Sequence, residues 1–166
     1  MTYYDDIAAG YEELHRTEQM RKIEICMRYI MPKKEEKLLD VGCGSGISTE
    51  VWECERHGID PSQELILVAD EHRNGPEYKV GKVEELPYED EFFDYVISVT
   101  AIQNFDDLKK GLSEMHRVLK KGGKVIISTL KDSPQIKEIE QAIMETFTID
   151  EMVDDVIDVF FIGRRI

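Results

Sequence analysis

Short apolar runs alternate with amphipathic stretches along most of this 166-residue chain. Runs with the length and composition of buried strands lie at residues 36–41, 56–60, 78–80, 92–100 and 124–130. Residues 108–119 instead place their apolar side chains at the spacing of an amphipathic helix, which a glycine of KKGG, residues 120–123, is expected to cap. Residues 61–73 are expected to form another helix, with Leu65, Val68 and Ala69 on its inner face. Because strands that alternate with helices form parallel sheets with both faces covered, the sequence predicts a three-layer α/β fold.

The two ends of the chain differ from this alternating pattern. Residues 3–30 are expected to form one helix that Pro32 closes. Residues 146–166 alternate as two antiparallel strands, the second from about Val156 to Gly163. We therefore expect a mostly parallel sheet with an antiparallel final strand.

Length, composition and charge limit the classes of function. A chain of 166 residues with 42% hydrophobic residues can bury one core, so a single domain over residues 1–166 is expected. The sequence has no apparent membrane span or secretory signal, which favours a cytoplasmic protein. The formal net charge of −14 repels polyanions and disfavours nucleic acid as a substrate, although the acidity can equally serve solubility alone. The three cysteines are widely spaced, and no side-chain spacing suggests a metal site.

The motif LLDVGCGSG, residues 38–46, places three glycines directly after a predicted buried strand. Gly42, Gly44 and Gly46 permit a backbone with positive φ and leave no Cβ between a ligand and the main chain. The N–H groups at the start of the following helix suit an anionic group such as a carboxylate. The alternative is a glycine turn that only bends the chain.

Asp60 ends the second predicted strand, in the sequence HGIDPS. A carboxylate at this place can accept hydrogen bonds from both hydroxyls of a ribose, which selects a nucleoside sugar. Alternatively, Asp60 caps the helix that follows, because Pro61 and Ser62 come directly after it. The two roles are compatible only if different oxygens serve them.

In this order, the motifs resemble those of the class I S-adenosylmethionine-dependent methyltransferases, most closely the small-molecule type that includes the ubiquinone and menaquinone C-methyltransferases. The resemblance rests on YYDDIAAGYEELH, LLDVGCGSG, GIDPS, VEELPYEDEFFDYVIS and EMHRVLKKGGKVIIS, and it covers most of the chain. It implies a Rossmann-like methyltransferase fold with a seven-stranded sheet and a helical lid at residues 1–31. It also implies S-adenosylmethionine as cofactor and S-adenosylhomocysteine as product.

The resemblance further implies which residues bind the cofactor. Asp40 would orient its methionine end, and Asp60, next to Pro61, would hold the ribose hydroxyls. Val83 and Glu84 would lie along the adenine. The other implied cofactor-binding residues are Tyr11 in the amino-terminal segment, Gly42, Cys43, Gly44 and Gly46 in the glycine turn, Pro61 after Asp60, and Val99 and Gln103 at and after the end of the fourth strand.

The chain departs from the family pattern at two places that concern the site. Lys82 stands where relatives often carry Asp, and a lysine cannot accept a hydrogen bond from the adenine amino group. Gln103 and Asn104 stand where many relatives have a pair of histidines. Together with His15 of the amino-terminal segment, they are the candidate catalytic residues, although a surface role for His15 is the alternative.

The expected function is in-line transfer of a methyl group from S-adenosylmethionine to a small-molecule acceptor. No insertion follows the strands, so either the acceptor is small or a large partner docks on an open site. A nicotinamide dinucleotide-binding domain is the alternative enzyme, but the spacing G-x-G-x-G differs from the G-x-G-x-x-G of that class. A non-catalytic S-adenosylmethionine-binding partner or regulatory subunit is the alternative from another class. A protein partner or a homodimer is compatible with the sequence.

Overall fold

A computed structural model describes residues 3–166, with side chains from residue 13 onward, and its contacts form two compact units, residues 1–31 and 32–166. The first unit contains helix α1 (Tyr3–Met27). This helix ends three residues before the expected end at Ile30, whose N–H still donates to the Cys26 carbonyl at 3.1 Å. Tyr11 belongs to α1, but its side chain lies outside the described part. The lid role of residues 1–31 therefore stays a prediction.

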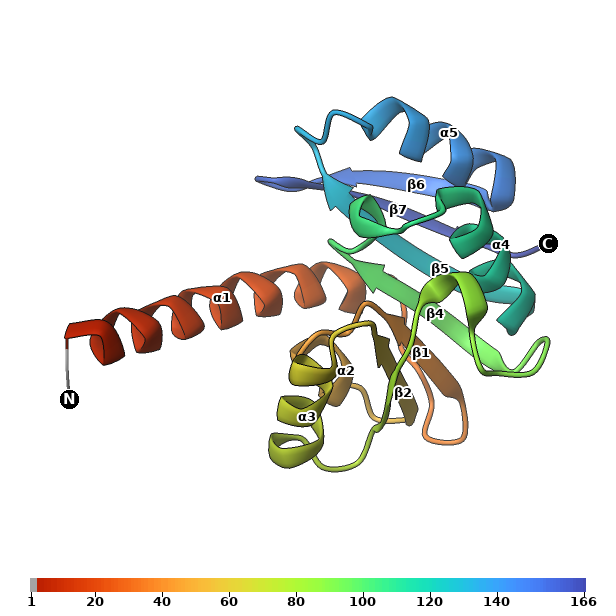
Figure 1. The fold of residues 1–166 in the computed structure, drawn as a ribbon. Helices are drawn as coiled ribbons and strands as arrows, with labels where there is room; N and C mark the ends of the chain where they lie inside the picture. The colour runs from red at the N-terminus through yellow and green to blue at the C-terminus, as the bar shows by residue number, and fades with distance from the viewer. Residues whose placement is uncertain (1–2) are drawn as a thin grey trace. The chain divides into compact units, whose positions relative to one another are not determined.

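The second unit alternates strands and helices in the predicted order (Figure 1). Its elements are β1 (Lys37–Val41), α2 (Ile47–Glu50), β2 (Glu55–Asp60), α3 (Gln63–His72), β3 (Glu77–Val80), β4 (Phe93–Val99), α4 (Leu108–Val118), β5 (Leu119–Leu130), α5 (Ile136–Thr146), β6 (Thr148–Asp154) and β7 (Asp158–Arg164), with two short 3₁₀ turns, η1 (Val83–Glu85) and η2 (Ile102–Asn104).

The seven strands form one sheet in the order β3-β2-β1-β4-β5-β7-β6. Strands β1 to β5 are parallel, whereas β7 runs antiparallel to both of its neighbours, β5 and β6. The predicted seven-stranded, mostly parallel sheet with an antiparallel final strand is confirmed. Strand β1 pairs with β2 on one side and with β4 on the other, so the chain reverses its winding direction between β1 and β4. Ligands of open α/β sheets bind at such a switch point, beyond the carboxyl ends of the strands.

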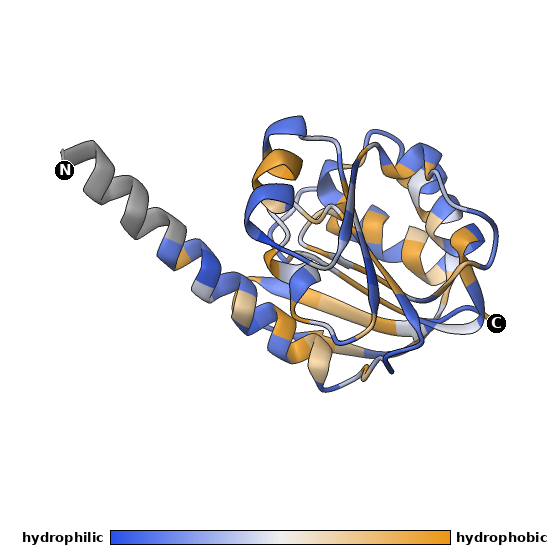
Figure 2. Ribbon diagram, turned by 90° about the horizontal axis from the view of Figure 1, so that it is seen from below, coloured by the Kyte–Doolittle hydropathy of each residue, from blue (hydrophilic) through white to orange (hydrophobic). Residues whose placement is uncertain are grey.

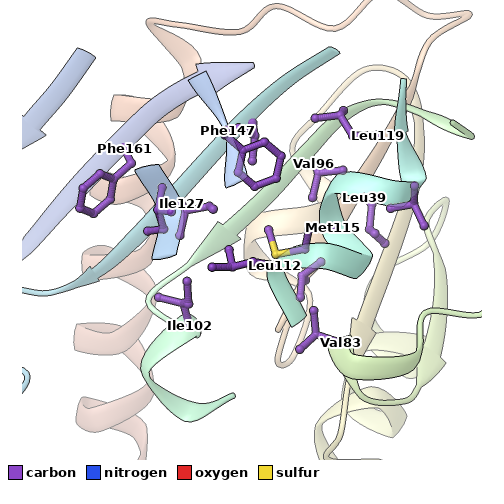
Figure 3. Close-up of a cluster of buried hydrophobic side chains, with 14 of the residues drawn as sticks. Leu39, Val83, Val96, Ile102, Leu112, Met115, Leu119, Ile127, Phe147 and Phe161 are labelled. Atoms are coloured by element: carbon purple, nitrogen blue, oxygen red, sulfur yellow. The ribbon is translucent and has the colours of Figure 1, made fainter. Parts of the chain in front are cut away.

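The larger core cluster lies between the sheet and helices α4 and α5. Leu39, Val96 and Ile127, from three neighbouring strands, are buried with Leu112 and Met115 of α4. Figure 3 shows these side chains gathered in one cluster. Figure 2 shows apolar and polar residues interleaved along the helices, as expected of helices that bury one face against a sheet.

Helix α3 packs on the opposite face of the sheet. Adjacent strand residues point to opposite faces, and on β2 Ile59 belongs to the larger cluster while Gly58 faces Cys43 and Tyr78. Cys43 and Tyr78 form a smaller cluster with Ile66 and Ala69 of α3. The three predicted layers are therefore present.

Two local expectations were wrong. The predicted inner face of α3 included Leu65 and Val68, but both are exposed, and Ile66 with Ala69 makes the contact. The glycines of KKGG were expected to cap the helix before them. That helix already ends at Val118, and the glycines lie inside β5, where only Gly122 has a positive φ, of 78°.

Replacing a core leucine tests this packing. Leu112→Ala should lower the free energy of unfolding by about 2–5 kcal/mol, because Leu112 is fully buried and its loss leaves a cavity. Urea denaturation measures the change. Leu67→Ala is the matched control, since Leu67 is 53% exposed, and it should change stability by less than about 0.5 kcal/mol. Equal losses in the two variants would contradict the assigned core.

Candidate functional site

The glycine turn follows β1 directly and is held against the end of β2. The N–H groups of Gly42 and Cys43 donate to the Ile59 carbonyl at 2.8 and 3.1 Å. Gly42, Gly44 and Gly46 have φ angles of 75°, 54° and 88°, a region that favours glycine. The predicted positive-φ turn at the carboxyl end of the first strand is therefore observed, next to the switch point.

The three glycines are required for different reasons. A Cβ on Gly42 would lie 2.5 Å from the Ala101 Cβ, and one on Gly46 would lie 2.5 Å from the Tyr78 hydroxyl. These two positions are closed by side chains of the protein itself. At Gly44 the nearest atom is the Leu65 Cδ1 at 3.9 Å, so Gly44 is the glycine at which a ligand has room to approach the backbone.

Asp60 links the glycine turn to the start of α3. Its Oδ2 accepts a hydrogen bond from the Gly44 N–H at 2.9 Å, and its Oδ1 accepts one from the Ser62 N–H at 2.9 Å. Each carboxylate oxygen retains a lone pair for a further donor, so both can serve the hydroxyls of a ribose. The helix-cap alternative for Asp60 is wrong, because Ser62 is the cap and accepts from the Leu65 N–H at 3.2 Å.

Asp40 is fully buried and faces the start of α2. The hydroxyls of Ser48 and Thr49 donate to its Oδ2 at 2.5 and 2.9 Å. Burial raises the pKa of this carboxyl to about 6, although the two hydroxyls oppose that shift. Its Oδ1 is buried and makes no hydrogen bond within the described part of the chain. Asp40 thus holds the helix that follows the glycine turn, and any influence on a ligand passes through that turn.

Cys43 turns its thiol away from the open side of the turn. The side chain is 5% exposed and packs in the cluster with Ile66, Ala69 and Tyr78. Burial, followed by the charges of Asp40 and Asp60, raises the pKa of the thiol far above its ordinary range. The thiol therefore stays protonated and is not a nucleophile, and only the backbone of Cys43 is available to a ligand.

The segment after β3 is joined to the segment after η2. The Lys82 Nζ lies 2.7 Å from the Asp106 Oδ2, and this hydrogen bond raises the pKa of the lysine. The Glu84 Oε1 accepts from the Asp106 N–H at 3.1 Å. Val83 is buried in the main core, so only its backbone is available to a ligand. Asp106 thus places a carboxylate next to Lys82, the position at which relatives often carry an Asp.

Gln103 is oriented by its neighbours. Its Nε2 donates to the Thr100 carbonyl at 2.9 Å, and its Oε1 accepts from the Thr129 hydroxyl at 3.3 Å. Both amide atoms therefore hold the segment after β4, which favours a structural role over proton transfer. Val99 ends β4 and is buried, and the side chain of Asn104 is exposed.

Three sequence-predicted residues remain. Pro61 is exposed directly after Asp60. His15 is exposed on α1, in the first compact unit, and Tyr11 has no described side chain. The structure therefore brings together the glycine turn, Asp60 and the segments after β3 and β4, and the roles of His15 and Tyr11 stay predictions.

Sequence reasoning missed several residues that support the turn. The Arg73 Nε donates to the Ser45 carbonyl at 2.7 Å, and its Nη1 pairs with the Glu50 carboxylate at 3.0 Å. Ser48 and Thr49, the partners of Asp40, follow Gly46 after one intervening residue, so two adjacent hydroxyls at a helix start were a usable signal. Arg73 lies at the end of α3, and no local pattern relates it to the turn.

The family of methyltransferase domains matches residues 39–127, which is more than half of the chain. The malonyl-[acyl-carrier protein] O-methyltransferase of Salmonella typhimurium is 27% identical over 157 residues, which cover 89% of this chain. The chain spans 62% of the length of that relative.

The solved structures that are similar in fold include the following two. One belongs to the complex between the Haloferax volcanii Trm112 methyltransferase activator and a protein assigned as a methyltransferase; the TM-score is 0.77 at 18% identity, over 99% of this chain and 98% of that chain. The other is phosphoethanolamine N-methyltransferase 2 of Haemonchus contortus in complex with S-adenosyl-L-methionine; the TM-score is 0.72 at 22% identity, over 87% of this chain and 52% of that chain.

Acidification should relieve the buried charge of Asp40. The folded pKa of about 6 lies above the ordinary 3.8, so this carboxyl favours the folded state below about pH 4 and loses that contribution as the pH rises through 6. Relative to Asp40→Asn, the wild-type free energy of unfolding should rise by roughly 2 kcal/mol between about pH 7.5 and pH 4. Urea denaturation of both proteins across this range measures it, and parallel pH profiles would contradict it.

Proposed function

Because this chain belongs to the family of methyltransferase domains, we propose that it transfers the methyl group of S-adenosylmethionine to a small-molecule acceptor. The observation that carries the proposal is the pairing of Gly44 with Asp60. The only glycine of the turn with open space beside it donates its N–H to a carboxylate that has lone pairs left for a ribose.

The described residues fit the cofactor as follows. Asp60 would accept the ribose hydroxyls, and the backbone of Gly44 would lie along the methionine end. When bound, S-adenosylmethionine supplies a methyl group that its positive sulfur already activates. The protein therefore mainly has to align the acceptor and exclude water, and such positioning can contribute roughly 7–11 kcal/mol.

The acceptor would bind beside the segment after β4 and the end of β5, where the Thr129 hydroxyl donates to the Gln103 Oε1. The names of the similar proteins include O-methyl and N-methyl transfer, so they suggest no single acceptor atom. Gln103 and Asn104 are the described candidate residues nearest in sequence to this end of β4. We assign them positioning of the acceptor rather than proton transfer, because neither amide titrates at ordinary pH.

A non-catalytic role is the second candidate. The Haloferax structure is a complex with a methyltransferase activator and matches this chain almost end to end, which favours a protein partner for this chain too. Purified protein incubated with methyl-labelled S-adenosylmethionine and pools of small-molecule and protein acceptors separates the two roles. Labelled small molecules support the enzyme. Cofactor binding without any labelled product supports a regulatory subunit.

Replacing Asp60 tests the cofactor site. Asp60→Ala should weaken binding of S-adenosylhomocysteine by about 1.5–3 kcal/mol, the range for hydrogen bonds to a charged group. Isothermal titration calorimetry measures the affinity, with Asp70→Ala on the exposed side of α3 as control. Unchanged affinity in Asp60→Ala would remove this residue from the site. Binding of NAD in place of S-adenosylmethionine would overturn the proposed function.

The Lys82–Asp106 pair suggests how adenine is bound without the usual acidic residue. Asp106 would accept the hydrogen bond from the adenine amino group. Asp106→Asn should then weaken the binding of S-adenosylhomocysteine by about tenfold, which corresponds to the loss of one charged hydrogen bond. The affinity for S-inosylhomocysteine, which lacks the amino group, should stay nearly unchanged. Calorimetry with both ligands measures the difference, and Glu85→Gln in the neighbouring turn is the control. Equal losses for both ligands would contradict this role.

A further inference from the structure

Thr100 adopts a backbone conformation that its residue type disfavours. It follows β4 directly and has a φ of 55°, one of two non-glycine residues with positive φ in the described part of the chain. For a β-branched residue this conformation is a genuine outlier. Such strain persists only where the surrounding structure holds it, and it concentrates at functional sites.

Two neighbouring strands hold Thr100 in this conformation. Its N–H donates to both the side-chain and the main-chain oxygen of Ser128 on β5, at 2.9 and 3.1 Å. Its hydroxyl donates to the Asp158 Oδ2 on β7 at 2.5 Å. The Ser128 hydroxyl donates to the same Asp158 oxygen at 2.9 Å. Ser128 and Asp158 are both fully buried, so these hydrogen bonds lie in a region of low dielectric, where they are strong.

Thr100 determines how closely the segment after β4 approaches the glycine turn after β1. Ala101 comes directly after Thr100, and its Cβ lies where a side chain on Gly42 would have to be, 2.5 Å from that ideal position. The Thr100 carbonyl also accepts from the Gln103 amide at 2.9 Å. The conformation of Thr100 thus positions Ala101 against the glycine turn and orients Gln103.

We propose that Asp158 is a positioning residue of the cofactor site, acting from the antiparallel strand β7 through Thr100. By holding Thr100 at positive φ, together with Ser128, it sets the distance between the segment after β4 and the glycine turn after β1. This inference rests on the proposed function for its consequence in cofactor binding. The structural part, the coupling of Asp158 to Gly42, is independent of it.

Glycine at position 100 separates this positioning role from general stabilisation. Glycine adopts a positive φ without strain, so it should not need Asp158 to hold the turn. In Asp158→Ala, the amide resonances of Gly42 and Ala101 should shift in two-dimensional NMR spectra of the free protein. In the double variant Asp158→Ala with Thr100→Gly, the Gly42 resonance should return toward its wild-type position. A merely structural role for Asp158 predicts no such return.

Cofactor affinity provides the second readout. Asp158→Ala should weaken the binding of S-adenosylhomocysteine about tenfold. In the double variant, the affinity should recover to within about threefold of the wild-type value, although this protein should stay less stable than wild type in urea. Asp158→Asn keeps an acceptor oxygen and should lose less affinity than Asp158→Ala. Should Asp158→Ala fail to fold, Ser128→Ala, with and without Thr100→Gly, gives the same comparison at the other partner of Thr100.

Asp94→Asn is the matched control. Asp94 lies on β4, the strand that Thr100 follows, but at the opposite end of that strand, where it accepts from the Lys37 N–H and pairs with Lys120. This variant should leave the Gly42 resonance and the affinity unchanged. An unshifted Gly42 resonance in Asp158→Ala, or a double variant as weak as Asp158→Ala alone, would overturn the proposal. A wild-type protein that fails to bind S-adenosylhomocysteine contradicts the proposed function, and the NMR comparison then decides the role of Asp158 by itself.

Discussion

The parallel pairing of β1 with β2 on one side and β4 on the other is the constraint on which the candidate site depends. Parallel strands end at the same edge of a sheet, so the glycine turn, Asp60 and Thr100 meet there although they are far apart in sequence. The Ile59 carbonyl extends this pairing beyond β1, because it accepts hydrogen bonds from the first two residues of the glycine turn. The backbone at the site is thus a continuation of the sheet and inherits its rigidity.

Three carboxylates lie at this edge, of which Asp40 and Asp158 are fully buried and Asp60 is 9% exposed, and each is engaged by donors of the protein. Asp40 accepts from two hydroxyls, Asp60 from two backbone N–H groups, and Asp158 from the hydroxyls of Ser128 on β5 and of Thr100 after β4. A buried carboxylate is tolerated only with such partners, and in a low dielectric those hydrogen bonds hold the connecting segments firmly. The site is therefore preorganised by its acidic side chains, while its ligand-facing surface is mostly backbone.

The expectations from the sequence succeeded where local composition sets the structure and failed where tertiary packing does. The strands and the glycine turn follow from local composition, because apolar runs and glycines impose their conformation within a few residues. The inner face of α3 was wrong because Leu65 and Val68 are as apolar as Ile66, and only the position of the helix over Cys43 and Tyr78 selects the buried side. The cap of α3 was ambiguous for a similar reason, since Asp60 and Ser62 are both good capping residues.

The sequence by itself determined the element order, the positive-φ turn after the first strand and the place of a carboxylate after the second, because each depends on residues that are neighbours in the chain. Only the tertiary structure decided which glycine is open, which carboxylate Lys82 meets, and that Asp158 holds Thr100 across two strands. These contacts join residues about 20 to 60 positions apart, and no local spacing encodes them. They exist because strand pairing and helix packing bring the carboxyl ends of the strands within hydrogen-bond distance.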